Sequence, residues 1–261
     1  EHRLLSGGGW TTVAELVPGQ RLALARHMPE PSHPQRWPEH HLILLGHLVG
    51  DGSYLSGQPL RYATASEENS AAVRAAAESF GSRVTRYAGR GRWHQLLISG
   101  NGNRWHPAGV GRWLKDLGIF GQRSHEKHLP AAVFTLADDQ IALLLKHLWA
   151  TDGSVTLRKP GSRGGPGVHF STSSMRLAHD VAALLLRLGI VARLRTVHTP
   201  GYRPMFSVNV SGSDAQSRFV SLVGGFGPRA SPVTRLEHHL ATVEPNPNVD
   251  TVPLEVFGAI R

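Results

Sequence analysis

The chain has 261 residues, of which 40% are hydrophobic, which is enough for one large domain or two small ones with a packed core. Its 28 Lys and Arg residues exceed its 19 Asp and Glu residues, and the formal net charge of +9 favours a polyanion such as nucleic acid over a small metabolite. The sequence has no long apolar span, no signal-peptide pattern and no cysteine, which excludes a membrane span and a disulfide framework. We therefore expect a cytoplasmic protein with no membrane partner.

The first 40 residues contain many turn signals. Glycines at 7–9 break the chain, and a turn at 17–20 precedes an alternating stretch, which together predict short strands. Four prolines within 28–40 then predict a linker. The 16 histidines show no repeated spacing and have no cysteine partners, so we expect no structural zinc site.

A different pattern begins at Leu42. Apolar residues recur there at helical spacing until Asp51, and Gly52 is a typical residue with which to end the helix. The segments that follow predict, in order, a helix behind a capping serine, two strands and a further helix, over 69–80, 83–87, 94–99 and 109–117.

The same order of elements then recurs. A helix over 139–151 ends on Asp152 and Gly153, and behind it we predict a strand, a helix and two more strands, over 167–171, 174–188, 191–197 and 205–210. The stretch YATASEEN at 62–69 aligns with HFSTSSMR at 169–176, and the two aspartates lie 152 − 51 = 101 residues apart. These echoes indicate an internal duplication.

Two stretches carry a family resemblance. LLGHLVGDG at 44–52 and LKHLWATDG at 145–153 resemble the two signature helices of LAGLIDADG homing endonucleases, in the single-chain form that holds two halves. The resemblance covers about residues 40–225. Residues 1–26, with His2 at a motif position, resemble the end of the N-terminal splicing region of an intein, and 249–261 resemble the segment that follows the nuclease in replicative-helicase inteins.

The resemblance implies an α+β fold of two pseudo-symmetric αββαββα halves, with paired central helices and DNA-binding antiparallel sheets. It also implies a monomer that makes a metal-dependent double-strand cut in a long double-stranded DNA target. The predicted divisions are a splicing-region remnant with its linker, the first half, the second half and a C-terminal tail, over 1–36, 37–138, 139–227 and 228–261. The sequence begins on Glu1 instead of Cys or Ser and does not end on His-Asn, so we expect no protein splicing from it.

A physical argument places the chemistry at the two aspartates. Pairing the two apolar helices in parallel brings Asp51 and Asp152 together, where like charges at negative helix ends require a divalent cation. Hard oxygen ligands favour Mg²⁺, with Mn²⁺ as a substitute, and such a site suits phosphodiester hydrolysis. We assign the preceding residues, Gly50 and Thr151, to the same metal site. The alternative is that each Asp-Gly pair is only a turn signal at the end of a helix.

The two signature helices differ at their interface. Gly46 and Gly50 in the first helix correspond to His147 and Thr151 in the second, and small residues on one helix can accommodate larger ones on the other. We predict that His147 packs over Gly46 or Gly50. The alternative is that His147 faces solvent or a polar neighbour.

A basic residue is also expected near the aspartates. The segment SHEKHLPAAVF at 124–134 resembles the lysine-x-apolar-proline segment of intein endonucleases, whose lysine approaches the active centre, and Lys127 holds that position. A cation there could orient the attacking water or neutralise charge on the phosphate. The alternative is a lysine in a surface loop. For the counterpart in the second half, the sequence leaves Arg229 and Arg235 open.

DNA contacts would fall on the strands and their turns. The family's curved sheets lie along the major groove, and alternation sends every second side chain towards the DNA. The predicted contacts are Arg83, Arg86, Arg90, Arg92, His94, Arg158, Lys159, Arg163, Arg193, Arg195 and Arg203. Each could instead be solvated surface charge. The alternative function is a catalytically decayed DNA- or RNA-binding protein of the maturase or regulator type, whereas no phosphate loop or dinucleotide motif supports a metabolic enzyme.

Overall fold

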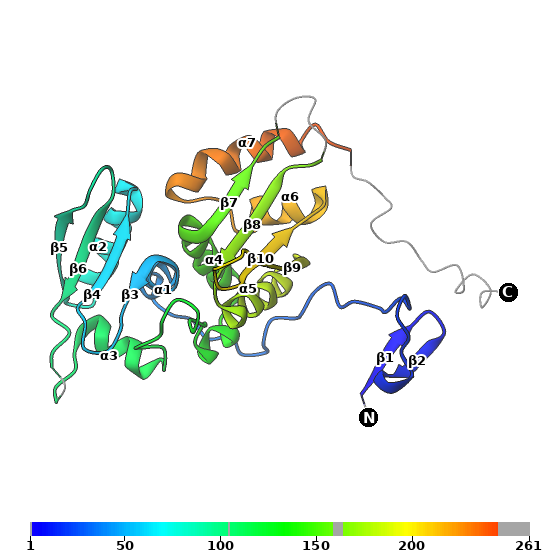
Figure 1. Ribbon diagram of the computed structural model, residues 1–261, viewed down its shortest axis with the longest axis horizontal. Helices are drawn as coiled ribbons and strands as arrows, with labels where there is room; N and C mark the ends of the chain where they lie inside the picture. The colour runs from blue at the N-terminus through cyan, green and yellow to red at the C-terminus, as the bar shows by residue number, and fades with distance from the viewer. Residues whose placement is uncertain (1, 104, 159–163, 245–261) are drawn as a thin grey trace.

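The computed structural model describes residues 2–103, 105–158 and 164–244. A small antiparallel hairpin of β1 (Arg3–Ser6) and β2 (Gly9–Thr12) begins the chain, followed by the short η1 (Val13–Glu15). This hairpin lies to one side of the main body (Figure 1). Hydrogen bonds fix the end of the proline-rich segment. Gln35 exchanges backbone hydrogen bonds with Thr135 and Ala137. The side chain of Gln140 also forms hydrogen bonds with the backbone of Trp37.

The first half of the main body follows the order helix, two strands, helix, two strands, helix. Its sheet is antiparallel with strand order β3-β4-β6-β5. The second helix begins at the predicted capping serine, since Ser66 Oγ accepts from the backbone N–H of Asn69 at 3.1 Å. The elements are α1 (Glu39–Asp51), β3 (Gly52–Ser53), β4 (Leu60–Thr64), α2 (Glu67–Glu78), β5 (Arg83–Ala88), β6 (His94–Ser99) and α3 (Gly109–Asp116).

The second half repeats this order and this sheet topology, β7-β8-β10-β9. Its second helix is capped in the same way, because Ser174 Oγ accepts from Leu177 N–H at 3.2 Å. The elements are α4 (Asp138–Asp152), β7 (Gly153–Thr156), β8 (Gly167–Thr172), α5 (Met175–Arg187), β9 (Ala192–Val197), β10 (Met205–Val210) and α6 (Ser213–Leu222), with η2 (Ala131–Thr135) between the halves.

The two αββαββα halves predicted from the sequence are therefore confirmed. The long elements fall within a few residues of their predicted ranges, whereas the short strands β3, β4 and β7 and the helix α6 were not predicted. Behind α6, η3 (Gly227–Arg229) leads into α7 (Ala230–Leu240), which packs on α6 and β7. Val233 and Leu236 of α7 are buried, so this part of the predicted tail completes the core of the second half.

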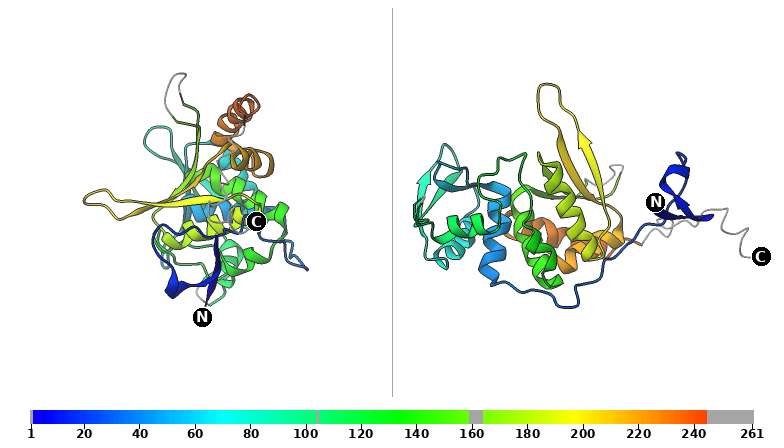
Figure 2. Two further views of the ribbon diagram at one scale, coloured as in Figure 1. Left: turned by 90° about the vertical axis from the view of Figure 1, so that its right-hand side faces the viewer. Right: turned by 90° about the horizontal axis from the view of Figure 1, so that it is seen from below.

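The core forms where α1 and α4 pack against each other in the middle of the molecule. The helix α2 covers one face of the first sheet, and α5 covers one face of the second sheet. Figure 2 shows the hairpin of β9 and β10 extending away from the helices. None of the helices in the described part of the chain is long and apolar enough to cross a membrane.

Candidate active site

The pairing of α1 and α4 depends on two glycines that allow the helices to approach closely. A Cβ atom on Gly46 would lie 2.8 Å from Leu148 N and 3.0 Å from His147 Cβ, and one on Gly50 would lie 2.6 Å from Thr151 Cβ. The predicted packing of His147 over Gly46 is confirmed. His147 also meets a polar neighbour, because its Nδ1 lies 3.1 Å from His47 Nε2.

This pairing brings Asp51 and Asp152, the last residues of the two helices, close enough for the charge of one to affect the other. Each aspartate ends its helix and is followed by a glycine that packs against the preceding turn, so neither Gly52 nor Gly153 has room for a side chain. Both carboxyls are accessible to solvent, as a group that meets a substrate must be. The surrounding protein nonetheless limits their hydration, which raises the pKa of both, and the charge of Asp152 helps to raise the pKa of Asp51 to about 6.

Lys127 lies at the end of α1 and is buried, with 5% of its surface exposed. Its Nζ donates to the carbonyl oxygens of Gly50 at 2.7 Å, Gly52 at 2.8 Å and Leu48 at 3.3 Å. The ammonium therefore satisfies carbonyl groups at the negative end of the helix. Burial lowers the pKa of Lys127 to about 8, although the charges of Asp152 and Asp51 oppose that shift.

Arg229 occupies the corresponding place at the end of α4. Its guanidinium donates to the carbonyl oxygen of Thr151 at 3.2 Å, and Thr151 corresponds to Gly50 in the repeat. The positive charges of Arg229 and Lys127 both act to lower the pKa of Asp51 and of Asp152. Arg235, the other residue that the sequence left open, instead bonds Ser231 within α7. The structure therefore selects Arg229 as the counterpart of Lys127.

A buried polar chain lies beneath the two carboxylates. Tyr62 Oη lies 3.0 Å from His47 Nδ1, and His47 Nε2 lies 3.1 Å from His147 Nδ1. The ring of His147 packs on that of Phe226, with 4.4 Å between the ring centroids. Burial lowers the pKa of His47 to about 3 and that of His147 to about 4. The neighbouring His147 further disfavours protonation of His47, and the charge of Lys146 does the same for His147. Both imidazoles are therefore neutral at neutral pH. Because Phe226 precedes η3, this chain links the helix pair to the segment that holds Arg229.

Comparison with known proteins shows what the chain resembles. Residues 139–224 match the model of the family described as LAGLIDADG-like domain. The chain therefore contains a LAGLIDADG-like domain. It is also 40% identical to the replicative DNA helicase DnaB of Rhodothermus marinus, over 98% of this chain and 28% of that protein. The RecA protein of Mycobacterium tuberculosis is 28% identical over 88% of this chain and 30% of its own length.

The chain thus spans less than a third of each of these two curated relatives. Among solved structures, variants of the homing endonuclease I-DmoI align with a TM-score of 0.49 and 14% identity, over 71% of this chain and 95% of that chain.

Each four-stranded sheet has an outer face, which we define as the face opposite α2 or α5. In the first sheet, the pairing register places Arg61, Leu97 and Thr85 in one row of this face, and Arg83 pairs with Ser99 in the next. In the second sheet, Arg193 and Arg195 lie on the outer face, paired with Asn209 and Ser207. The predicted placement of Arg83, Arg193 and Arg195 on accessible strand positions agrees with the structure.

Two of the predicted contacts lie on the wrong face. His94 is 2% exposed and packs towards the helices, because it shares its face of β6 with Leu96 and Ile98. Arg86 lies three residues from Arg83 and hence on the opposite face, where it forms a two-pronged ion pair with Glu67 of α2 at 2.6 and 2.7 Å. The prediction that His94 contacts DNA is wrong, and Arg86 is engaged within the protein.

Four of the remaining predicted contacts lie in loops. Arg90 and Arg92 are exposed in the turn between β5 and β6, Arg203 is exposed in the turn between β9 and β10, and Arg158 is exposed just after β7. Lys159 and Arg163 lie outside the described residues. Arg61 was not among the predicted contacts, although its alternation with the buried Leu60 and Tyr62 indicates the outer face.

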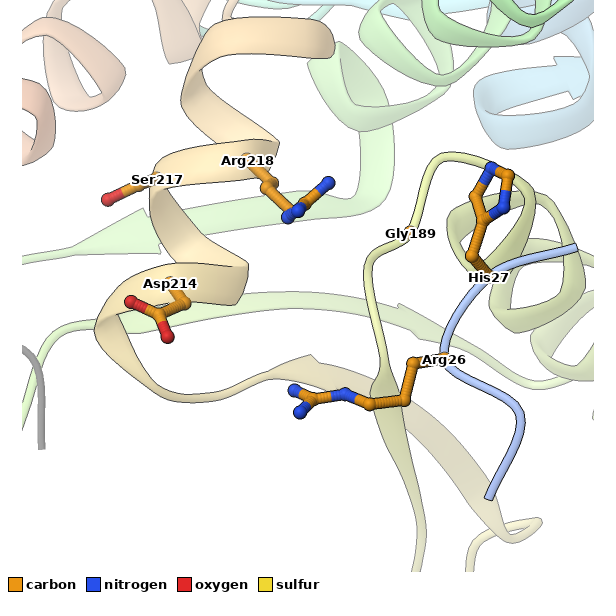
Figure 3. Close-up of a pocket in the computed structure, with 6 residues that line it drawn as sticks. All are labelled: Arg26, His27, Gly189, Asp214, Ser217 and Arg218. Atoms are coloured by element: carbon orange, nitrogen blue, oxygen red, sulfur yellow. The ribbon is translucent and has the colours of Figure 1, made fainter. Parts of the chain in front are cut away.

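The cavity near the aspartates is small compared with another on the surface. One of about 440 Å³ lies beside Asp51 and is also lined by Thr151, Asn69 and Arg229. A larger one of about 820 Å³ lies away from the carboxylates, between the N-terminal segment and α6. Figure 3 shows Arg26 and His27 on one side of it and Arg218 and Asp214 on the other.

Proposed function

We propose that this protein is a site-specific homing endonuclease that makes a metal-dependent double-strand cut in a long DNA target. The observation that carries the proposal is the arrangement at the helix ends. Asp51 and Asp152 end two paired helices, and the carbonyl group just before each of them accepts a hydrogen bond from a cation, Lys127 or Arg229. Each pseudo-symmetric half supplies one carboxylate and one cation. This arrangement suits a reaction that occurs once on each DNA strand.

The residues present fit a divalent metal. Asp51 and Asp152 offer hard oxygen donors whose mutual repulsion a Mg²⁺ or Mn²⁺ ion would relieve, with the carbonyl oxygens of Gly50 and Thr151 as further donors. Within the described residues there is no group of three or more His, Cys, Asp or Glu side chains that could hold a metal. Water and DNA phosphate oxygens would therefore complete the coordination. A bound ion would supply charge neutralisation at the scissile phosphate and activation of water.

The two cations give the chain its own means of stabilising the reaction. Negative charge builds up on the phosphate oxygens in the transition state, and preorganised cations in a crowded site stabilise that charge. Lys127 is held by three carbonyl groups, so its ammonium needs little reorganisation. Arg229 is held in the other half through η3. We assign Lys127 and Arg229 this electrostatic role, with Asp51 and Asp152 as the catalytic carboxylates.

Double-stranded DNA is the partner that the charge and the open sheet faces favour. The net charge of +9 suits a polyanion, and the outer faces carry Arg61, Arg83, Arg193 and Arg195 at alternating strand positions. Because one chain supplies both carboxylates, a monomer is sufficient. Two non-identical halves also suit a target that need not be palindromic.

We further propose that the domain derives from an intein. The relatives are named for unrelated host proteins, a replicative helicase and RecA, yet each matches nearly the same stretch of this chain over less than a third of its own length. A mobile segment inserted into different hosts explains this pattern. Residues 1–36 would then be a splicing-region remnant with its linker, 37–138 and 139–227 the two nuclease halves, and 228–261 a connection back towards the splicing region. A cytoplasmic location suits such a protein.

A cleavage selection tests the proposed function. A randomised duplex library is incubated with the protein in Mg²⁺ and, separately, in Ca²⁺, and the cut and bound molecules are sequenced. We expect a discrete double-strand cut in Mg²⁺ at a defined sequence. Salt-sensitive, site-specific binding without cutting in Mg²⁺ or Mn²⁺ would contradict the nuclease and support a decayed DNA-binding protein, and specific capture of RNA would support the maturase type.

A further inference from the structure

Large apolar side chains remain exposed at the far ends of two equivalent hairpins. The hairpin of β5 and β6 carries Tyr87 and Trp93, which are 53% and 46% exposed. The hairpin of β9 and β10 carries Tyr202 and Met205, which are 79% and 45% exposed. The two hairpins occupy the same place in the pseudo-symmetric halves. Exposure of such side chains in the equivalent hairpin of each half points to a binding surface.

In the first hairpin the aromatic side chains share the outer face with the arginines. Tyr87 pairs with Gln95, and residues two apart on a strand share a face, so Trp93 lies on the same face as Tyr87. The backbone of Gly89 donates to Trp93 O at 3.0 Å and closes the turn. The indole ring lies over Gly89, since a Cβ atom there would overlap it. Trp93 is therefore held in place without being covered.

The second hairpin presents its aromatic side chain from a rigid turn. Tyr202 N–H donates to Thr199 O at 3.1 Å, with Pro200 and Gly201 at the central positions and φ +79° at Gly201. These are the residues that a type II turn requires. Tyr202 follows directly, and the hairpin extends away from the helical body (Figure 2). The turn thus fixes the backbone from which the ring projects, so that ordering this backbone on binding costs little conformational entropy.

Arginines flank the exposed rings in both hairpins. Arg90 and Arg92 lie in the first turn, and Arg203 follows Tyr202 in the second. A purely apolar protein partner would not favour these charges, whereas DNA offers phosphates to the arginines and base edges, thymine methyl groups and sugars to the rings. Charge complementarity therefore favours DNA as the occupant.

We infer that Trp93 with Tyr87, and Tyr202 with Met205, form two apolar clamps that grip the outer ends of the DNA target, while the neighbouring arginines bind phosphates. This inference rests on the proposed function, because the clamps act on the same DNA that the carboxylates would cut. The apolar contacts at the ends are less sensitive to salt than the phosphate contacts. They add affinity to the complex without taking part in the reaction.

Shortened duplexes test the clamps. A duplex recovered by binding selection from the randomised library is trimmed stepwise from each end, and dissociation constants are measured for the intact chain, Trp93→Ala and Tyr202→Ala. On the full duplex we expect each variant to bind on the order of 10-fold more weakly, a difference of about 1.4 kcal/mol. When the duplex is trimmed at the end that one clamp contacts, the variant that lacks the ring of that clamp should bind it as tightly as the intact chain does. Trp93→Ala and Tyr202→Ala should lose their effect at opposite ends.

Two matched variants serve as controls. Tyr202→Phe keeps the ring and should bind like the intact chain. Trp10→Ala removes another exposed aromatic ring, on the N-terminal hairpin, and should change neither affinity nor its dependence on duplex length.

The outcomes separate the clamps from the proposed function. If the intact chain cuts DNA but the two variants bind every duplex as tightly as it does, or are weakened equally on full and trimmed duplexes, the clamps are overturned and the nuclease stands. If Tyr202→Phe loses as much affinity as Tyr202→Ala, the tyrosine acts through its hydroxyl group, which also overturns its role as an apolar clamp. A chain that binds no duplex overturns both.

Discussion

Lys127 Nζ lies 2.7 Å from the carbonyl oxygen of Gly50, directly before Asp51. Arg229 repeats this contact in the other half, on the carbonyl oxygen of Thr151 directly before Asp152. The separation of the two cations, 229 − 127 = 102 residues, is within one residue of the separation of the aspartates. The duplication has therefore preserved a carboxylate and a cation in each half, although the cations differ in type and arrive from different local structures.

Replacing Lys127 by Met should lower the cleavage rate at saturating DNA on the order of 10²- to 10³-fold, because a preorganised cation is lost at the phosphate. Affinity for the target in Ca²⁺ should change little. Cleavage assays with Lys115→Met, which removes an exposed lysine on α3, provide the matched control. Since Lys127 also satisfies carbonyl groups of α1, thermal unfolding must show that the variant is folded at the assay temperature. A folded Lys127→Met protein that cuts at the normal rate would contradict the electrostatic role.

Replacing Gly46 by Ala should destabilise the fold by about 1–3 kcal/mol, because the added methyl group meets backbone atoms of α4 that can move only by separating the helices. A Cβ atom there would lie 2.8 Å from Leu148 N and 2.9 Å from Leu144 O. Denaturant unfolding measures the change. Gly8→Ala is the control, since its nearest non-neighbouring atom, Ser6 Oγ, lies 4.0 Å away. Equal stabilities for the two variants would show that the helices are not in close contact.

The free energy of unfolding should decrease as the pH falls below about 6.5 in metal-free buffer. His47 and His147 have folded pKa values of about 3 and 4, lowered by burial, whereas in the unfolded chain they titrate near 6.5. Below that pH the unfolded state binds more protons, and each histidine contributes a slope of up to about 1.4 kcal/mol per pH unit.

Asp51 acts in the opposite direction, because its raised pKa makes the folded state bind a proton between about pH 6 and 4. The raised pKa of Asp152 acts in the same direction as that of Asp51, so the two aspartates offset part of the loss from the histidines. Urea unfolding of Asp51→Asn as a function of pH should therefore show a steeper loss of stability on acidification than the intact chain. The double variant His47→Met with His147→Met should lose less stability per pH unit on acidification than the intact chain. An unchanged slope in that double variant would mean that the two imidazoles are not the titrating groups.

Replacing Arg61 by Ala should weaken DNA binding several-fold and reduce the slope of log affinity against log salt by about 1, if it contacts a phosphate from the outer face. Arg112→Ala removes an exposed arginine that pairs with Asp116 on α3, and should leave binding unchanged. Titrations at several salt concentrations distinguish the two. Identical behaviour of Arg61→Ala and Arg112→Ala would place the DNA on a different face.

The sequence predicted the carboxylate pair because two independent signals coincide there. Helical apolar spacing placed α1 and α4, and the Asp-Gly ends in both copies placed Asp51 and Asp152 at the same end. The short strands β3 and β7 were missed, since two to four residues directly behind a helix carry too little pattern. The helix α7 was missed because Pro232 suggests a break, although proline is tolerated in the first turn of a helix.

Other parts of the site depend on packing that a single strand does not reveal. Alternation shows that Arg83 and Arg86 lie on opposite faces, but which face the helices cover depends on where α2 docks. His94 is polar and follows an arginine-rich turn, yet it lies on the covered face together with Leu96. Likewise, the choice between Arg229 and Arg235 depended on η3, whose backbone carries Arg229 to the end of α4.

The most direct test of the central claim is cleavage of a supercoiled plasmid that carries the selected target, with the intact chain and with Asp51→Asn and Asp152→Asn. We expect the intact chain to linearise the plasmid in Mg²⁺ or Mn²⁺. Neither variant should produce linear DNA, although both should still bind the target in Ca²⁺. Linear product from either variant at the rate of the intact chain would show that the paired carboxylates are not the catalytic centre.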